Sequence, residues 1–109
     1  LNVMSSRVAD LVAGGARDRW PLAGDQLFVD LDLSAASLPA GTQLGIGGAV
    51  IEVTDQPHRG CAKFAARYGA DARRWVNAGD GDGLRLRGLN ARVVVEGEVS
   101  EGDAVTKLD

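Results

Sequence analysis

The sequence contains very little cysteine or histidine. Among its 109 residues there is one cysteine, Cys61, and one histidine, His58. A single cysteine cannot form an internal disulfide, and it excludes the cysteine-rich sites that hold structural zinc or iron–sulfur clusters. It also fits the reducing cytoplasm, which is where we expect this protein to be located.

The sequence also has fewer basic than acidic residues. The 12 lysine and arginine residues are outnumbered by 15 acidic residues, which leaves a formal net charge of −3 at pH 7. Binding to nucleic acid or to a membrane surface needs a basic face. No apolar run approaches the roughly 20 residues that cross a bilayer, and no signal-peptide pattern is visible. We therefore expect neither nucleic acid nor a membrane as a partner.

Length and composition predict one domain over residues 1–109. The hydrophobic fraction of 45% and the charged fraction of 25% are ordinary for a soluble protein with a single core. The chain opens directly on the apolar run Leu1-Asn2-Val3-Met4, which resembles the end of a strand. We therefore expect the chain to be the C-terminal part of a longer protein.

Periodic patterns predict a mainly β fold with short helices (α+β), arranged as a β-barrel or curled antiparallel sheet. Gly47-Gly48 joins two β-rich runs, as in a hairpin. The apolar run Val93-Val94-Val95 predicts a strand that is covered on both faces. Strands are predicted at residues 26–33, 43–46, 49–54, 84–86, 90–97 and 104–108, helices at 5–13, 62–68 and 70–76, and a loop at 16–25.

Two glycine-rich stretches resemble ligand-binding loops but lack their essential residues. Gly45-Ile46-Gly47-Gly48 lacks the lysine and the following helix of a phosphate-binding loop. Residues 77–83, which include Asp80 and Asp82, lack the glutamate of a calcium-binding EF-hand. We expect this second stretch to form a mobile lid or a plain turn.

The stretch around Cys61 concentrates residues that activate a thiol. His58, Arg59 and Lys63 place cationic groups on both sides of it, and a predicted helix begins there. Nearby cations and helix N-termini lower a thiol pKa from roughly 8.5 to as low as 3.5–7.5. Cys61 therefore has reason to be a thiolate. Further donors for an anion are Arg17, Arg19, Arg85, Arg87 and Arg92.

Four roles for Cys61 remain open on these residues alone. A cysteine protease needs a thiol–imidazole pair, and His58 lies too close in sequence for that geometry to be expected. Sulfur transfer needs only an accessible thiolate that carries or attacks a persulfide. A soft or high-valent transition metal needs a thiolate ligand, with basic residues for a cofactor phosphate. The fourth role is that of a small buried apolar residue.

Three segments share their order and spacing with a known domain family. The first is Ile46-Gly47-Gly48-Ala49-Val50-Ile51-Glu52-Val53-Thr54, and the second is Pro57-His58-Arg59-Gly60-Cys61-Ala62-Lys63-Phe64. The third is Gly88-Leu89-Asn90-Ala91-Arg92-Val93-Val94, followed by Gly97-Glu98-Val99-Ser100-Glu101-Gly102-Asp103-Ala104-Val105. Together they resemble the MOSC domain, the C-terminal domain type of molybdenum-cofactor sulfurases. The upstream segments 20–25 and 30–34 resemble a small bacterial subgroup of that family.

The resemblance implies a MOSC-like β-barrel that binds molybdenum cofactor (molybdopterin), with Cys61 as a catalytic sulfur carrier or molybdenum ligand. It implies sulfur transfer or reduction of an N-oxygenated small molecule, with a redox or sulfur-donor protein as a further partner. Pyridoxal phosphate binding is also associated with the family. The alternative is a non-enzymatic β-barrel binding module in which Cys61 is structural. Residues expected to contact the cofactor are His58, Arg59, Lys63, Asn90 and Arg92.

Overall fold

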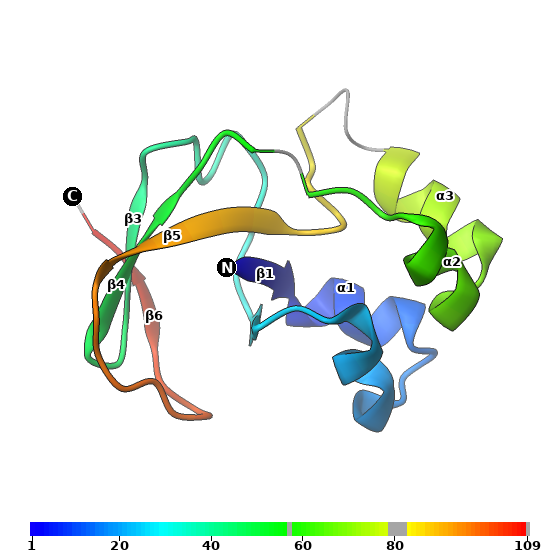
Figure 1. Ribbon diagram of the computed structural model, residues 1–109, viewed down its shortest axis with the longest axis horizontal. Helices are drawn as coiled ribbons and strands as arrows, with labels where there is room; N and C mark the ends of the chain where they lie inside the picture. Colours follow the sequence, from blue (N-terminus) through cyan, green and yellow to red (C-terminus); the bar gives the residue numbers. More distant parts are fainter. Residues whose placement is uncertain (57, 79–82, 109) are drawn as a thin grey trace.

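Alternating hydrophobic residues build a six-stranded sheet within the described residues, and the helices gather at one end of it (Figure 1). The computed structural model describes residues 1–56, 58–78 and 83–108. Its elements are β1 (Asn2–Ser5), α1 (Ser6–Val12), the 3₁₀ helix η1 (Arg17–Ala23), β2 (Leu27–Val29), β3 (Gln43–Ile46), β4 (Ala49–Val53), α2 (Ala62–Tyr68), α3 (Ala70–Ala78), β5 (Leu89–Val95) and β6 (Val105–Lys107).

The sheet joins the first strand of the chain to one of the last. Its strand order is β2-β1-β5-β4-β3-β6. β1 and β2 run parallel, with Val3 opposite Leu27, whereas the other pairs among the described strands are antiparallel. On its other edge β1 meets β5, with Asn2 opposite Asn90 and Val3 opposite Leu89. The curled half-barrel with short helices confirms the predicted fold class.

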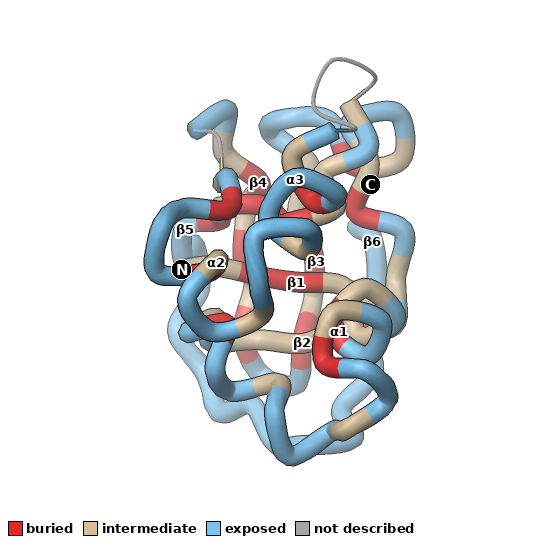
Figure 2. The backbone as a smooth tube through the Cα atoms, turned by 90° about the vertical axis from the view of Figure 1, so that its right-hand side faces the viewer, coloured by how far each residue is buried: buried red, intermediate tan, exposed pale blue. Residues whose placement is uncertain are grey.

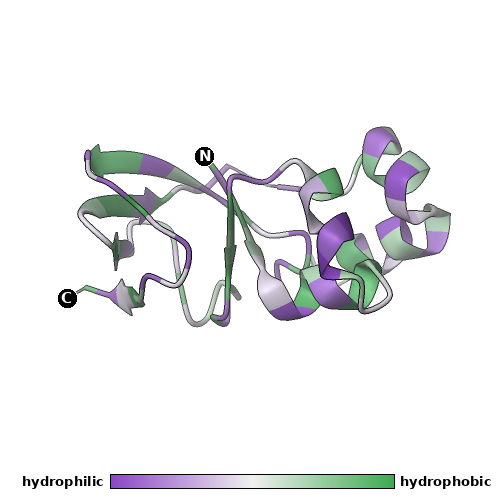
Figure 3. Ribbon diagram, turned by 90° about the horizontal axis from the view of Figure 1, so that it is seen from below, coloured by the Kyte–Doolittle hydropathy of each residue, from purple (hydrophilic) through white to green (hydrophobic). Residues whose placement is uncertain are grey.

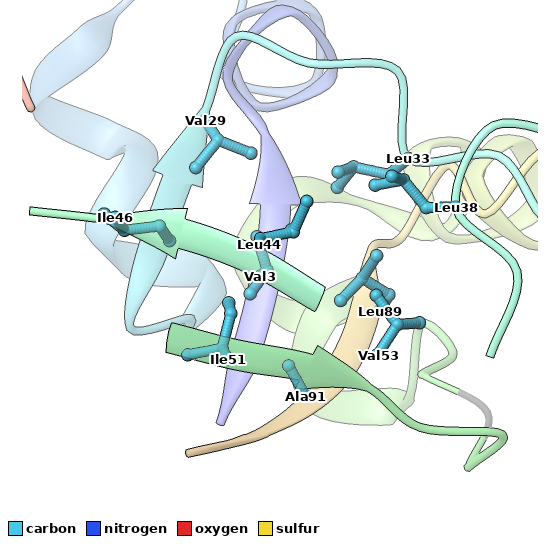
Figure 4. Packing of buried hydrophobic residues seen from close by; sticks show 10 residues of the cluster. All are labelled: Val3, Val29, Leu33, Leu38, Leu44, Ile46, Ile51, Val53, Leu89 and Ala91. Carbon is cyan, nitrogen blue, oxygen red and sulfur yellow. The ribbon is translucent and has the colours of Figure 1, made fainter. Parts of the chain in front are cut away.

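β1 separates two hydrophobic cores, because its successive side chains point to opposite faces. Val3 belongs to the core inside the curled sheet, Met4 belongs to a second core beneath the helices, and both are fully buried. Burial of an aliphatic side chain of this size contributes roughly 1.5–3 kcal/mol. Figure 4 shows the side chains of the first core converging between the strands, and Figure 2 shows buried stretches through β1 and β4. The second core also contains Ala9, Ala23, Phe64 and Val76.

The helices are amphipathic, which explains how they cover the second core. In α3, Val76 is fully buried, whereas the neighbouring Arg73 and Arg74 are exposed. Figure 3 shows hydrophobic and hydrophilic positions alternating along the helices, while the strands are mostly hydrophobic. The helices predicted at residues 5–13, 62–68 and 70–76 correspond to α1, α2 and α3 and are confirmed, as is the hairpin of β3 and β4.

Three predictions of local structure were wrong. The strand predicted at 26–33 ends at Val29, because Asp32 accepts hydrogen bonds from the Ser34 N–H (2.9 Å) and the Ser37 hydroxyl (2.8 Å) and turns the chain. The loop predicted at 16–25 contains the helix η1. The strand predicted at 84–86 is instead part of a turn, in which the Gly88 N–H donates to the Arg85 carbonyl at 2.9 Å.

The sequence predicts that the run Val93-Val94-Val95 is covered on both faces, and this prediction is wrong. The exposed fractions of these residues are 52%, 39% and 48%. In the described pairing, β1 lies beside β5 only as far as Asn90, and a register shift interrupts the pairing with β4 between Val50 and Ile51. The second half of β5 therefore extends past the core.

Some predictions concern residues outside those described. Pro57 of the cysteine motif lies outside them, as do Asp80 and Asp82 of the glycine-rich stretch. The lid or turn expected at residues 77–83 is wrong for residues 77 and 78, which continue α3, and it stays a prediction for residues 79–82.

Candidate functional site

Cys61 lies immediately before α2, where its backbone is still extended (φ −113°, ψ −176°). The residue is exposed, and its side chain forms no capping hydrogen bond. The backbone N–H of Phe64, followed by that of Lys63, nevertheless lowers the pKa of the Cys61 thiol, and the charge of Arg87 adds a smaller effect. Cys61 is therefore an accessible thiol and not a buried apolar residue.

We expect Cys61 to react with iodoacetamide faster near pH 7 in the folded protein than in the urea-unfolded protein. The lowered pKa raises the thiolate fraction, and the accompanying loss of nucleophilicity offsets only part of this gain. The same shift stabilises the fold above the pKa of the unfolded thiol, and this contribution is lost as the pH falls through the folded-state pKa. The measurement is the second-order alkylation rate by mass spectrometry, and equal rates in the two states would contradict the prediction.

A buried ion cluster joins the stretch before Cys61 to two distant parts of the chain. Arg87 Nη1 lies 2.8 Å from Asp25 Oδ1, and His58 Nε2 lies 3.2 Å from Asp25 Oδ2. The exposed fractions of the side chains are 0% for Asp25, 7% for Arg87 and 12% for His58. A carboxylate buried this deeply needs a charged partner, because burial of an unpaired charge is very costly. The Asp25–Arg87 pair is therefore essential to the packing beneath the site.

The remaining contacts of Arg87 connect it to the second core. Nη2 donates to the Ala23 carbonyl at 2.9 Å, and Nη1 lies 3.8 Å from Met4 Sδ. The guanidinium lies 5.0 Å from the centroid of the Phe64 ring in α2. Its Nε atom is buried and has no hydrogen-bond partner among the described residues. Arg87 thus brings a positive charge and one unpaired donor beneath the start of α2.

A pocket of about 390 Å³ opens beside the stretch that precedes Cys61, and its basic side chains are His58, Arg59 and Arg85. Arg85 has a left-handed backbone (φ 51°), and its Nη1 donates to the Leu38 carbonyl at 2.6 Å. Partial burial lowers the pKa of Arg85. A non-glycine residue held in this conformation indicates a local constraint of the kind found at binding sites. Its other lining residues within the described part of the chain are Ala35, Thr54, Asp55, Gln56, Gly83, Gly88 and Leu89.

Three of the residues expected to contact a cofactor lie in or behind this pocket. His58 and Arg59 line it directly. Asn90 Nδ2 donates to the carbonyl of Gln56, a lining residue, at 3.3 Å, so Asn90 supports the wall from behind. His58 Nε2 pairs with Asp25, which leaves the cysteine-protease interpretation of the His58–Cys61 spacing without support.

The other two expected residues lie outside the pocket lining. Lys63 is exposed in the first turn of α2. Arg92 Nη2 lies 2.7 Å from Glu52 Oε2 across the β4–β5 pair, and this hydrogen-bonded partner lowers the pKa of Glu52. The roles expected of Lys63 and Arg92 toward an anion stay predictions.

Sequence reasoning missed two residues that shape the site. Asp25 stands in Gly24-Asp25, which is typical of a turn, and nothing near it indicates a buried carboxylate. Asn77 lies in the last turn of α3 and hydrogen-bonds Gly60, which is 17 residues earlier in the sequence, so no local pattern predicts the contact. Within the described residues, no group of three His, Cys, Asp or Glu side chains could hold a metal ion.

Comparison with known protein families identifies the family of this chain. A sequence model of the MOSC domain matches residues 9–106, which include Cys61, His58 and Arg87. The chain belongs to the MOSC domain family. No curated protein gives a significant match to this MOSC domain. In the part of it that the structure describes, no helix is long and apolar enough to cross a membrane.

Solved structures share the fold of this MOSC domain. YiiM from Geobacillus stearothermophilus superposes with a TM-score of 0.66 and 18% sequence identity, over 100% of this chain and 54% of YiiM. A structure described as a hypothetical protein gives a TM-score of 0.68 and 19% identity, over 100% of this chain and 50% of that one. At these identities the likeness shows the fold alone. The MOSC domain spans about half the length of the structures it matches.

Proposed function

We propose that this MOSC domain binds molybdenum cofactor and that Cys61 supplies the thiolate that meets the metal. Molybdenum cofactor is associated with the family to which the chain belongs. The observation that carries the proposal is the exposed Cys61 thiol with its lowered pKa. A thiolate is the form of cysteine that binds transition metals.

The residues around Cys61 fit an anionic group. Arg87 has a buried Nε–H without a partner among the described residues, and its charge already lowers the pKa of the thiol. Arg59 and Arg85 line the neighbouring pocket, and arginine side chains suit phosphate oxygens. The donor set thus combines one sulfur ligand with cationic hydrogen-bond donors, which is the combination that a metal–pterin phosphate needs.

The residues of this chain contribute to the chemistry by binding the cofactor and orienting it. When bound, the cofactor supplies a metal centre that exchanges oxygen or sulfur atoms with small molecules. Arg59 and Arg85 would hold the phosphate of the cofactor. Arg87 would balance the negative charge of the Cys61 thiolate. Cys61 presents its sulfur at the protein surface, where a small-molecule substrate can approach.

The exposure of Cys61 also favours a second role, as a carrier of transferable sulfur. A carrier thiol must be reached by a sulfur-donor protein and must release its sulfur again. A permanent metal ligand has no need of either property. A persulfide on Cys61, detected as the mass of one added sulfur atom that dithiothreitol removes, is the signature of the carrier role.

The deciding experiment measures molybdenum and pterin in the chain purified from cells that make the cofactor. We expect both in the wild type, loss of molybdenum in Cys61→Ser, and loss of pterin in Arg59→Gln. Molybdenum is measured by plasma mass spectrometry, and pterin by the fluorescence of its oxidation product. Neither readout depends on a known substrate.

The matched control is Arg7→Gln, because Arg7 pairs with Asp30 on the surface and does not line the pocket. It should retain both molybdenum and pterin. A wild-type protein with neither would overturn the proposal, and full metal content in Cys61→Ser would exclude Cys61 as the ligand.

A further inference from the structure

One side chain at the end of α3, Asn77, holds the residue that precedes Cys61. The Gly60 N–H donates to Asn77 Oδ1 at 2.8 Å, and Asn77 Nδ2 donates to the Gly60 carbonyl at 3.0 Å. A single amide thus satisfies both backbone groups of one buried residue. Arg73 in the same helix adds a hydrogen bond from Nε to this carbonyl at 3.3 Å.

Gly60 also lies directly against α3, with no room for a side chain. A Cβ atom on Gly60 would stand 2.9 Å from Val76 Cγ2, closer than real Cβ contacts come, and 3.4 Å from Arg73 Cγ. Val76 is itself fully buried in the second core. The backbone at Gly60 is therefore fixed to α3 both by hydrogen bonds and by close contact.

These contacts hold the backbone from which the Cys61 side chain extends. The Gly60 carbonyl belongs to the planar peptide group that leads into Cys61, so holding that plane fixes the Cα of Cys61. The N–H groups of Lys63 and Phe64 lie in the first turn of α2, for which Cys61 is the N-cap residue. The alignment of the sulfur with them depends on how the preceding peptide is held.

The chain segment before Cys61 is thereby held at two points. His58 pairs with buried Asp25, and Gly60 pairs with Asn77. Arg59, which lines the pocket, lies between them. The first point is a contact with a buried carboxylate and joins distant segments, whereas the second is a neutral amide whose removal leaves no charge unpaired. Asn77 is for this reason the better residue to vary.

We propose that Asn77 is a positioning residue for Cys61: its paired hydrogen bonds to Gly60 hold the thiol in the orientation that its chemistry requires. This rests on the proposed function insofar as Cys61 is the reactive group. An amide suits the task because it carries a donor and an acceptor side by side.

The test compares Asn77→Leu with Arg74→Leu in the full chain. Leucine has nearly the shape of asparagine but forms no hydrogen bonds, and Arg74 lies on the same helix, where it pairs with Asp71. We expect Asn77→Leu to slow the alkylation of Cys61 by iodoacetamide about three- to tenfold near pH 6, with the rates converging near pH 9. The Gly60 amide should also lose protection from hydrogen exchange measured by NMR, and Arg74→Leu should match the wild type in both.

A folded Asn77→Leu protein with the wild-type pH profile would overturn the proposal, as would equal slowing in Arg74→Leu. If circular dichroism shows that Asn77→Leu does not fold, Asn77→Ser, which is too short for both hydrogen bonds, is judged by the same criteria. Slowed alkylation in the variant, together with a wild type that contains no molybdenum or pterin, would refute the cofactor proposal while supporting the positioning role.

Discussion

Replacing Arg87 with methionine should lower the free energy of unfolding by about 3–5 kcal/mol, the usual effect of removing one partner from a buried ion pair. The Asp25 side chain is 0% exposed, and without Arg87 its remaining ion-pair partner among the described residues would be His58. Since a domain of this size is stable by roughly 5–15 kcal/mol, this is a large share of the total. Urea denaturation followed by circular dichroism measures the loss.

The matched control is Arg7→Met, which removes a pair with Asp30 whose side chains are 82% and 69% exposed. It should change stability very little, because exposed ion pairs contribute little. Combining Arg87→Met with Asp25→Asn should recover part of the loss, since no unpaired charge then remains. An Arg87→Met protein as stable as the wild type would refute the structural role of the cluster.

Gly88→Ala should displace β1 from the start of β5. Gly88 has a φ of 120°, a conformation that favours glycine, and an added Cβ would lie 2.2 Å from the Val3 carbonyl oxygen and 3.2 Å from His58 Cδ2. Val3 lies in a strand paired on both edges, so it cannot move aside cheaply. We expect a loss of more than about 3 kcal/mol, above the range of backbone strain alone.

Gly69→Ala separates strain from collision. Gly69 has a similar φ of 101°, but nothing lies within 4 Å of an added Cβ. It should cost about 1–3 kcal/mol, the range for a side chain held in a region of φ and ψ (101°, 157°) that is essentially restricted to glycine. Equal losses for the two variants in urea denaturation would mean that the contact between Gly88 and β1 is unimportant.

Features that depend on sequence neighbours were predictable here. Alternation and Gly47-Gly48 predicted the β3–β4 hairpin, and apolar spacing predicted that a helix begins after Cys61. The N–H groups that lower the pKa of Cys61 come from the next turn of the chain, so that effect also follows from local sequence. The motifs around these segments were sufficient for the family, which the match over residues 9–106 confirms.

Features that depend on distant segments were not predictable. Asp25 resembles a turn residue, and it is buried only because Arg87 and His58 close over it from other parts of the chain. No spacing rule links these three positions. An apolar run such as Val93-Val94-Val95 likewise indicates a strand but does not reveal where the core beneath it ends.

The pairing of β1 with β5 has a consequence for how the protein folds. Asn2 and Asn90 come from opposite ends of the chain, so their contact closes a very long loop. Such contacts form late, after local units such as the β3–β4 hairpin and the α2–α3 pair. Closing a long loop costs conformational entropy before the contact itself contributes any stability. Arg87 reaches Asp25 in the same closure, since it lies two residues before the start of β5. Burial of the carboxylate and completion of the sheet should therefore be one cooperative event, with no stable intermediate that contains only one of them.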